Sequence, residues 1–479
     1  MKDLAQDRES APPQNRRDAG PEPGIVPPGG AAARADLLAL YLRLLPAVFL
    51  DKIEREHKRP NNRVYTAAVV MWLMICERLQ ENGTLQTAVL ELLRGLPADF
   101  WPHPCRRLRP DSGVTGPTLS SHTGAYNKAR QQLPVSVVEQ SCDRVFQQLA
   151  EQAAGRLPAL GQRAFFLDGT SVRLPYTAAL AALYPPGSNQ HGESHWPLLR
   201  VLVAHDLYTG LAMRPHWGPL NGSQAVSEQR LLAEALERLP SESVVVGDAN
   251  FGIFSVAYAA TMRGHSLLLR LTAVRAERLL GEPLRDGIDQ ALEWRPSRDD
   301  RRKHPDLPAD ACVPGRLIVR QVQPGNGAAP FLLALFTTLT GDSEQIVNLY
   351  GERWNVETDL RSLKITLRLE QLTCTTAEMV AKEIDMAMMA YNLVRALTYL
   401  AARKAGLPPR AFSFTRVRNV LNAFIPLLAA AQDEHEARKV WDDMMYYAGQ
   451  AKLPRRKRRR PSYPRAVWLQ PQPYPKHKP

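Results

Sequence analysis

The sequence predicts a protein of the α/β class: a mixed β-sheet flanked by helices, preceded by an all-helical domain and interrupted by an inserted subdomain. Three observations support this prediction. Apolar residues recur at helical spacing through residues 35–150. Short β-rich runs alternate with helical patterns from residue 163 onward. A long helical segment that carries Glu357 among basic residues follows the last of these runs.

The N-terminal third divides into a tail and a helical domain. Residues 1–34 are rich in Pro, Gly, Ala and charged residues and have no apolar pattern, so we expect them to be disordered. Residues 35–150 are expected to form the helical domain. Its clearest periodic stretches are 37–50, 66–79, 86–93 and 125–149.

The sheet is predicted from β-rich runs that begin after residue 160. Strands are expected at 164–174, 196–207, 211–217, 243–248 and 266–272. Helices are expected before each of the last two strands, at 227–239 and 256–263. Residues 273–330 are polar, Arg-rich and weakly periodic, and we expect them to form the inserted subdomain. The run FLLALFTTLT at 331–340 returns to strand character. Residues 160–272 and 331–405 are therefore assigned to one domain.

The C-terminal part is predicted to be helical as far as residue 450. One long helix that contains Glu357 is expected to begin near Asp342 or Ser343, either of which can cap it. A second helix is expected over 376–405, and residues 406–450 continue as a helical region. Residues 451–479 are a basic, Pro-rich tail.

The charge balance favours a polyanionic partner. The 479 residues include 61 Lys and Arg against 48 Asp and Glu, a net charge of +13. Nucleic acid is the usual partner of such a protein. The longest apolar run, AAVVMWLMIC at 67–76, is too short to span a bilayer, and the charged N-terminus has no apolar core of a secretory signal. The five cysteines form no CxxC pair, so we expect a cytoplasmic protein without disulfides or structural zinc.

The run LYGERWNVETDLRSLKITL at 349–367 places four functional side chains at helical spacing. Tyr350, Arg353, Glu357 and Lys364 are separated by offsets of 3, 4 and 7 residues. At roughly 100° per residue they fall within a stripe only ~60° wide on a continuous helix. A carboxylate flanked by a guanidinium, an ammonium and a phenol suits a site that holds a metal ion and a polyanion together. A solvated charged helix face is the alternative.

Two aspartates end apolar runs in the predicted sheet. Asp168 lies in FFLDGT and Asp248 lies in VVVGDANFG, each at the expected carboxyl end of a strand, where open α/β sheets place functional groups. Either alone could be a turn or cap residue. Together with Glu357 they supply three carboxylates, and Mg²⁺ prefers a few carboxylate oxygens while keeping positions for water and phosphate. Two such ions about 4 Å apart would promote phosphodiester cleavage.

These motifs and their order resemble the DDE transposases, which have a ribonuclease H-like fold. The YxxRxxxExxxxxxK run is similar to the YREK signature of the insertion-sequence-four family, and DGT at Asp168 and DANFG at Asp248 support the likeness over residues 112–468. The resemblance implies that Asp168, Asp248 and Glu357 bind the metal ions. It also implies that Tyr350 and Arg353 grip phosphates beside the cut and that Lys364 places the terminal DNA.

The resemblance suggests further residues with DNA roles. In this family an insertion-domain tryptophan can stack on a flipped base, and Trp294 is the candidate here, with a core aromatic as the alternative. Trp354 lies close to the YREK stripe, where it could instead pack the helix on the sheet. Glu228 resembles a glutamate often found at this position, although a helix N-terminal charge is the simpler account.

Basic residues outside the YREK run are expected to contact DNA phosphates. The helical domain, with SSHTGAYNKARQQLP at 120–134, resembles the region that recognises transposon ends. A helical bundle that does not recognise DNA would show the same sequence pattern and is the alternative. The remaining candidates are Lys128 and Arg130 in that domain and the C-terminal run Arg455, Arg456, Lys457 and Arg458.

The function predicted from these features is metal-dependent cleavage at transposon ends followed by transfer of the 3′-hydroxyl to target DNA. We expect two Mg²⁺ ions, for which Mn²⁺ can substitute. The expected partners are double-stranded DNA, as terminal inverted repeats and target, and a second copy of the chain in a synaptic homodimer, without membrane association. We expect a bacterial, nucleoid-associated protein. An inactive transposase-derived DNA-binding protein and a nuclease of the same fold without strand transfer are the alternatives.

Overall fold

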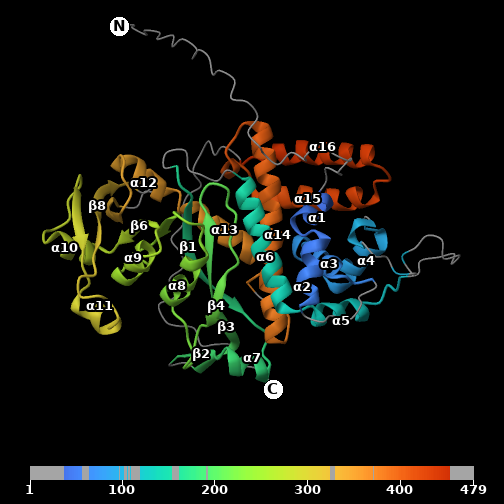
Figure 1. Ribbon diagram of the computed structural model, residues 1–479, viewed down its shortest axis with the longest axis horizontal. Helices are drawn as coiled ribbons and strands as arrows, with labels where there is room; N and C mark the ends of the chain where they lie inside the picture. Colours follow the sequence, from blue (N-terminus) through green and yellow to red (C-terminus); the bar gives the residue numbers. More distant parts are fainter. Residues whose placement is uncertain are drawn as a thin grey trace, which may run out of the picture.

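A mixed β-sheet flanked by helices forms the centre of the molecule, which confirms the predicted α/β class (Figure 1). The computed structural model describes residues 37–56, 64–96, 98–101, 105, 108, 119–153, 161–189, 192–323, 329–370 and 372–453. The predicted disordered tail at 1–34 and the basic run Arg455–Arg458 lie outside these residues.

The sheet has nine strands within the described residues, in the order β2-β3-β1-β5-β6-β9-β8-β7, with β4 paired to β3. Only the pairs β1–β5 and β5–β6 are parallel. The strands are β1 Ala164–Arg173, β2 Pro186–Asn189, β3 Gly192–Asp206, β4 His216–Pro219, β5 Val244–Gly247, β6 Ser266–Leu271, β7 Asp289–Trp294, β8 Val313–Val322 and β9 Phe331–Thr337.

The strands differ from the predicted ones at one edge of the sheet. The third strand, expected at 211–217, is the shorter β4 at His216–Pro219, and only Ala212 forms an isolated bridge before it. No strand was predicted between residues 175 and 195, but residues 186–189 form β2, which pairs with the start of β3. The backbone at Pro186 still accepts pairing because β2 lies at the sheet edge.

Residues 273–330 extend the same sheet. They contain α10 (Ala273–Leu280), β7, α11 (Arg298–Lys303) and β8. β8 pairs with β9, and β7 pairs with β8, so both strands continue the sheet beyond the parallel centre. The expected subdomain therefore adds two strands and two short helices to one end of the sheet.

The long helix α14, Ala377–Ala405, is the central support of the molecule. Its hydroxyl cap Thr376 accepts from the Met379 amide, and Gly406 ends the helix in the left-handed region at φ 62°. Most of its side chains are buried. Figure 1 shows α14 between the sheet and the N-terminal helices, and it contacts α3 (Ala67–Leu79), α6 (Val135–Gln152), α15 (Phe414–Ala430) and α16 (Glu434–Gln450).

The N-terminal helices match the predicted stretches except where proline divides them. The stretch 37–50 is two helices, α1 (Leu37–Leu44) and α2 (Ala47–Arg55), separated at Pro46. The stretch 125–149 is α5 (Gly124–Gln132) followed by α6, with Pro134 at the junction. Proline restricts the preceding residue and cannot donate a helical hydrogen bond, which explains both breaks. The fourth helix, α4, covers Leu85–Arg94.

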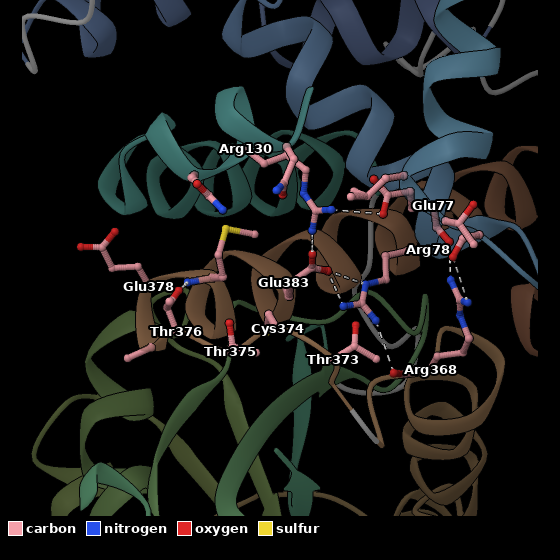
Figure 2. Close-up of a pocket in the computed structure, with 17 residues that line it drawn as sticks. Glu77, Arg78, Arg130, Arg368, Thr373, Cys374, Thr375, Thr376, Glu378 and Glu383 are labelled. Atoms are coloured by element: carbon pink, nitrogen blue, oxygen red, sulfur yellow. Dashed lines mark hydrogen bonds and ion pairs between the residues drawn. The ribbon is translucent and has the colours of Figure 1, made fainter. Parts of the chain in front are cut away.

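A buried ion-pair network joins the N-terminal helices to α14. Glu383 on α14 accepts from Nε of Arg78 at 3.0 Å and also from Arg130, which contacts Glu77 at 3.5 Å (Figure 2). Lys382 adds hydrogen bonds to two backbone carbonyls of α5. Breaking one partner of such a network leaves an uncompensated buried charge. The network therefore fixes α3 and α5 against α14.

The described helices include none that is both long enough and apolar enough to cross a bilayer.

Candidate active site

Asp168 and Asp248 lie level with each other on neighbouring strands. The parallel pairing of β1 with β5 matches Ala164 with Val244 and ends with Phe166 beside Val246. Two residues beyond this pair come Asp168, still on β1, and Asp248, the first residue after β5, so the two lie at equal distances along the chain from the last paired residues. Neighbouring strands are about 4.8 Å apart. The two carboxylates therefore start from adjacent positions where β1 and β5 diverge.

Asp168 was predicted to lie at the carboxyl end of its strand. In the structure it lies within β1, just beyond the part of β1 that pairs with β5. β1 continues to Arg173 alongside β3, with Asp168 opposite Val203. Only the β5 side of Asp168 is free of a strand partner, since β5 stops at Gly247. The opening between the two strands is therefore beside Asp168 and directly after β5.

The surroundings of Asp168 favour a bound cation. The pKa of Asp168 is raised to about 6, chiefly by burial and also by the nearby carboxylates of Asp248 and Glu228. The Gly169 amide, which donates to Oδ1 of Asp168 at 2.8 Å, and the Arg353 guanidinium act in the opposite direction. A positive charge at this position would relieve the crowding of negative groups.

Glu228 is held between the two aspartate segments. It is the first residue of α8 (Glu228–Arg238), so the simpler prediction of a helix N-terminal charge is consistent with its place in the fold. Its Oε2 accepts a hydrogen bond from the side-chain Nδ2 of Asn250 at 2.5 Å, and the backbone amide of Asn250 donates to Oδ1 of Asp248 at 2.9 Å. A Cβ at position 169 would lie 2.1 Å from Oε1 of Glu228, which explains the glycine there.

The segment that carries Glu357 is not the single helix that was predicted. It consists of α12 (Ser343–Gly351), α13 (Trp354–Arg361) and a π-helical turn at Ser362–Thr366. The amides of Glu352 and Arg353 bond three residues back, to Leu349 and Tyr350, which tightens the chain between the two helices. Asp342 caps α12 by accepting from the Gln345 amide at 3.0 Å, as one of the two predicted caps.

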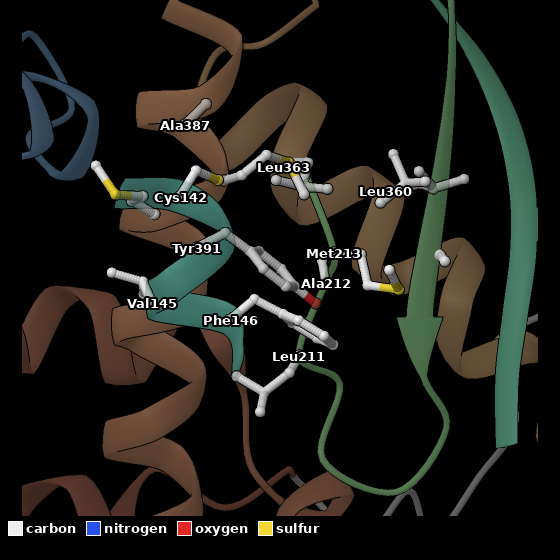
Figure 3. Close-up of a cluster of buried hydrophobic side chains, with 14 of the residues drawn as sticks. Cys142, Val145, Phe146, Leu211, Ala212, Met213, Leu360, Leu363, Ala387 and Tyr391 are labelled. Carbon is white, nitrogen blue, oxygen red and sulfur yellow. The ribbon is translucent and has the colours of Figure 1, made fainter. Parts of the chain in front are cut away.

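Buried apolar side chains hold α13 in place. Leu360 and Leu363 are 8% and 0% exposed and face the apolar layer formed by α6, α14 and the loop before β4 (Figure 3). Tyr391 on α14 and Phe146 on α6 lie in the same layer. The carboxylate of Glu357 is on the partly exposed side of α13, with a side-chain exposure of 42%.

Three of the four YREK side chains meet near the aspartates. Nη1 of Arg353 is 3.1 Å from Oε1 of Glu357, and the same guanidinium is close enough to Asp168 to lower its pKa. Tyr350 is 5% exposed; burial raises its pKa to about 12, with Arg353, Arg270 and Asp248 as neighbouring charges. Lys364 lies half-buried in the π-helical turn.

The donor set fits a hard divalent cation, but its three carboxylates are not gathered around one point. In the described part of the chain, no group of three or more His, Cys, Asp or Glu side chains is arranged to hold a metal ion. Glu357 is paired with Arg353 instead. Carboxylate oxygens are ligands that Mg²⁺ prefers, and a bound cation would favour the charged form of Asp168, whose pKa is raised.

An apolar cleft of about 650 Å³ adjoins Tyr350 and Arg353. Two exposed aromatic side chains line it: Trp354, which is 66% exposed, and Phe331, which is 39% exposed. The Arg353 guanidinium is 5.4 Å from the Trp354 ring, and that of Arg270 is 5.6 Å from the Phe331 ring. Trp354 thus does not pack α13 on the sheet.

Trp294, the candidate for stacking on a flipped base, is enclosed by aromatic side chains of the core in this structure. It is 3% exposed, at the end of β7. Its ring packs edge-on against Phe336 at 4.9 Å and against Phe254 at 6.1 Å. The alternative prediction, a core aromatic, describes its position.

The two basic candidates in the helical domain differ from each other. Lys128 is exposed on α5 and remains a predicted DNA contact. Arg130, two residues later, is 8% exposed and is bound to the carboxylates of Glu383 and Glu77, which occupy its guanidinium in this structure. Residues two apart on a helix are about 200° apart, so α5 turns one of these cations outward and the other inward.

Sequence reasoning missed Asn250, Arg270 and Phe331. Asn250 stood in the motif DANFG, but nothing in the sequence linked it to Glu228. Arg270 was visible as a single charge in the apolar run SLLLRLT, which is the signal of a strand end that faces a site. Phe331 reaches the cleft because β9 pairs with β6, a pairing between strands 60 residues apart.

Two sequence comparisons match this chain with transposases. Residues 159–393 match the family described as the transposase DDE domain. The transposase InsG for insertion sequence element IS4 of Escherichia coli (strain K12) is 24% identical over 362 residues, which cover 73% of this chain and 77% of that protein. The cryo-EM structure of a piggyBac transposase synaptic complex with hairpin DNA covers 87% of each chain with a TM-score of 0.42 and 12% identity.

Proposed function

We propose that this chain, which belongs to the DDE transposases, cuts DNA at both ends of a mobile element and joins the freed 3′-hydroxyl to target DNA. The observation that carries the proposal is the alignment of Asp168 and Asp248 beside Arg353, which lowers the pKa of Asp168 and pairs with Glu357. The succession β1, β3, β4, α8, β5, α9 (Phe254–Thr261) and β6, which α7 (Ala178–Leu183) and β2 interrupt after β1, supports the ribonuclease H-like assignment.

The carboxylates and the basic residues have separate tasks in this proposal. Asp168, Asp248 and Glu357 would hold two Mg²⁺ ions, or Mn²⁺, which activate the attacking oxygen and stabilise the leaving oxygen. Arg353 exchanges the Glu357 carboxylate for a phosphate oxygen when DNA is bound, since guanidinium groups bind both anions well. Tyr350, whose pKa is about 12, stays protonated at neutral pH and can donate to a phosphate oxygen. Lys364 contacts the terminal DNA.

The proposal is tested with purified protein, a plasmid that carries the native flanks of the coding region, and Mg²⁺. We expect nicks at the element ends and joined products in a second plasmid. Nicks without joined products would identify a nuclease of the same fold. Specific end binding without any nick would identify an inactive transposase-derived protein. We further propose a homodimer in which each subunit cuts the end that its partner holds. When inactive subunits are mixed with active ones, this arrangement predicts that cuts at both ends of the same element are lost.

The apolar cleft beside Tyr350 is proposed to receive a base displaced from the DNA end. Base–aromatic stacking contributes about 1–3 kcal/mol per base. We expect Trp354→Ala to reduce the fluorescence increase of a 2-aminopurine placed at the terminal base pair and to slow excision by about 10-fold, in line with that energy.

Trp354→Phe keeps a stacking surface and should retain most of the signal, whereas Trp294→Phe should change it little because Trp294 is buried. An unchanged 2-aminopurine signal in Trp354→Ala would contradict the assignment of the cleft.

A further inference from the structure

A second cleft, of about 600 Å³, lies along a different face of α13 from Glu357. Asn355, Thr358 and Ser362, which recur at helical spacing, form its α13 side. At roughly 100° per residue, Asn355 and Thr358 are about 160° and 100° around the helix from Glu357. The cleft is therefore separate from the site of the three carboxylates, although both share one helix.

Arginine dominates this cleft. Its charged lining residues are Glu81, Arg361, Arg368, Arg395, Arg410 and Arg418. The buried carboxylate of Asp359 binds Arg395 and Arg410, the latter at 2.6 Å. One carboxylate thus serves two guanidinium groups.

The remaining arginines are held mainly by uncharged groups. Nη1 of Arg418 donates to the Thr366 carbonyl at 3.0 Å, and its other nitrogens donate to the side chain of Asn419. Arg368 donates to the carbonyl of Gly83 at 3.3 Å and also to that of Glu77. Burial lowers the pKa of Arg418 and of Arg368, and Arg78 and Arg418 lower that of Arg368 further. These cations are arranged by backbone carbonyls but not neutralised by them.

The positive end of α15 adds to the same field. Ser413 caps this 17-residue helix and lines the cleft together with Phe414 and Thr415. Amide groups at a helix N-terminus carry a partial positive charge that favours anions. Arginine guanidinium groups bind phosphate oxygens in a bidentate manner. A polyanion with spaced phosphates is the ligand that such a lining recognises.

We propose that the arginine cleft between α13 and α15 binds the phosphate backbone of double-stranded DNA at positions away from the scissile phosphate. This inference rests on the proposed function for the identity of the polyanion. Because an α-helix with its side chains is about 10–12 Å across, backbone bound here lies about one helix diameter from the carboxylate site. The bound segment comes either from the element's own end or from target DNA, and both present the same phosphates.

The test measures DNA binding in EDTA, so that it does not depend on cleavage. The variants are Arg361→Gln, which removes an exposed cation, and Arg418→Gln, with Arg418→Lys as the charge-conserving partner. Arg302→Gln is the matched control, because Arg302 lies on α11 on the opposite side of the molecule and pairs with Asp299 at 3.0 Å (Figure 1). Affinity for a labelled end duplex and for an unrelated duplex is followed against salt concentration.

We expect each Gln variant to lower duplex affinity several-fold and to reduce the salt slope by about 0.9, the value for one phosphate contact. Loss on the end duplex alone assigns the cleft to the element's end. If affinity for the end duplex is unchanged but the KM for target DNA rises in strand transfer from a precut end, the cleft is assigned to target DNA. Arg418→Lys should keep the slope.

The proposal would be overturned if both Gln variants matched Arg302→Gln in salt slope, end affinity and target KM. It would also be overturned if the variants lost as much affinity for single-stranded RNA as for duplex DNA. Arg361 is only about 40° around α13 from Glu357. If Arg418→Gln fails to fold, Arg368→Gln, which also removes a cation from the cleft, therefore decides. A chain that binds as expected here but never cuts its flanks would contradict the proposed function while leaving the cleft assignment intact.

Discussion

Replacing Asp168 by Asn is expected to abolish cleavage at the element ends while DNA binding persists. Asp248→Asn and Glu357→Gln should have the same effect, because groups that act as one catalytic unit cannot substitute for each other. We expect the rate of end nicking to fall by at least about 10³-fold, since removal of one member of such a unit costs ~10⁴–10⁶. Single-turnover nicking of an end duplex measures this loss.

Asp299→Asn is the matched control for these three variants. Asp299 is exposed on α11 and pairs only on the surface with Arg302 at 3.0 Å, so its loss should leave the nicking rate unchanged. Nicking at near the wild-type rate by any one of the three variants would remove that residue from the proposed triad. Loss of end binding in all three would instead point to misfolding.

Asp359→Ala should cause the largest loss of stability of any single substitution in the site region. Asp359 is fully buried two residues after Glu357, where it accepts from Arg395 and from Arg410. Burial raises its pKa, but the two guanidinium groups outweigh burial and hold the pKa below its ordinary value. Removing the carboxylate leaves two buried cations, which costs about 3–5 kcal/mol for a broken buried pair.

Urea unfolding measures the effect. Asp359→Asn keeps the shape and one acceptor oxygen, so it should be less destabilising than Asp359→Ala at neutral pH. The contribution of the charged form is present above the ordinary pKa of an aspartate and is lost as the pH falls through the lowered value. The difference in the free energy of unfolding between wild type and Asp359→Asn should therefore shrink in acid. If Asp359→Ala lowered the free energy of unfolding by less than about 1 kcal/mol, the contacts of Asp359 with Arg395 and Arg410 would be no stronger than surface ion pairs.

The sequence was sufficient for features that depend on local periodicity. The strand runs around Asp168 and Asp248 and the helix over 376–405 were predicted within a few residues of β1, β5 and α14. Apolar runs bounded by turn residues, and a cap such as Thr376, are local signals. They predicted which residues lie on the sheet opening before any pairing was known.

What the sequence could not give depends on contacts between distant segments. Trp294 and Arg130 carry chemically suitable side chains, but β7 and α5 point them inward, and only the pairing of β7 with β8 and the charge of Glu383 decide this. The break between α12 and α13 comes directly after Gly351, in the run YGERWNVET, which has no proline to announce it.

Iron-mediated cleavage of the polypeptide tests most directly whether three distant carboxylates share one metal site. Fe²⁺ replaces Mg²⁺ in oxygen-ligand sites, and with ascorbate and peroxide it cuts the backbone close to where it is bound. The account predicts cuts near residues 168, 248 and 357 in the DNA-bound protein, all suppressed by excess Mg²⁺ and by Asp168→Asn. Cuts confined to the two strands, with the segment around Glu357 untouched, would contradict it.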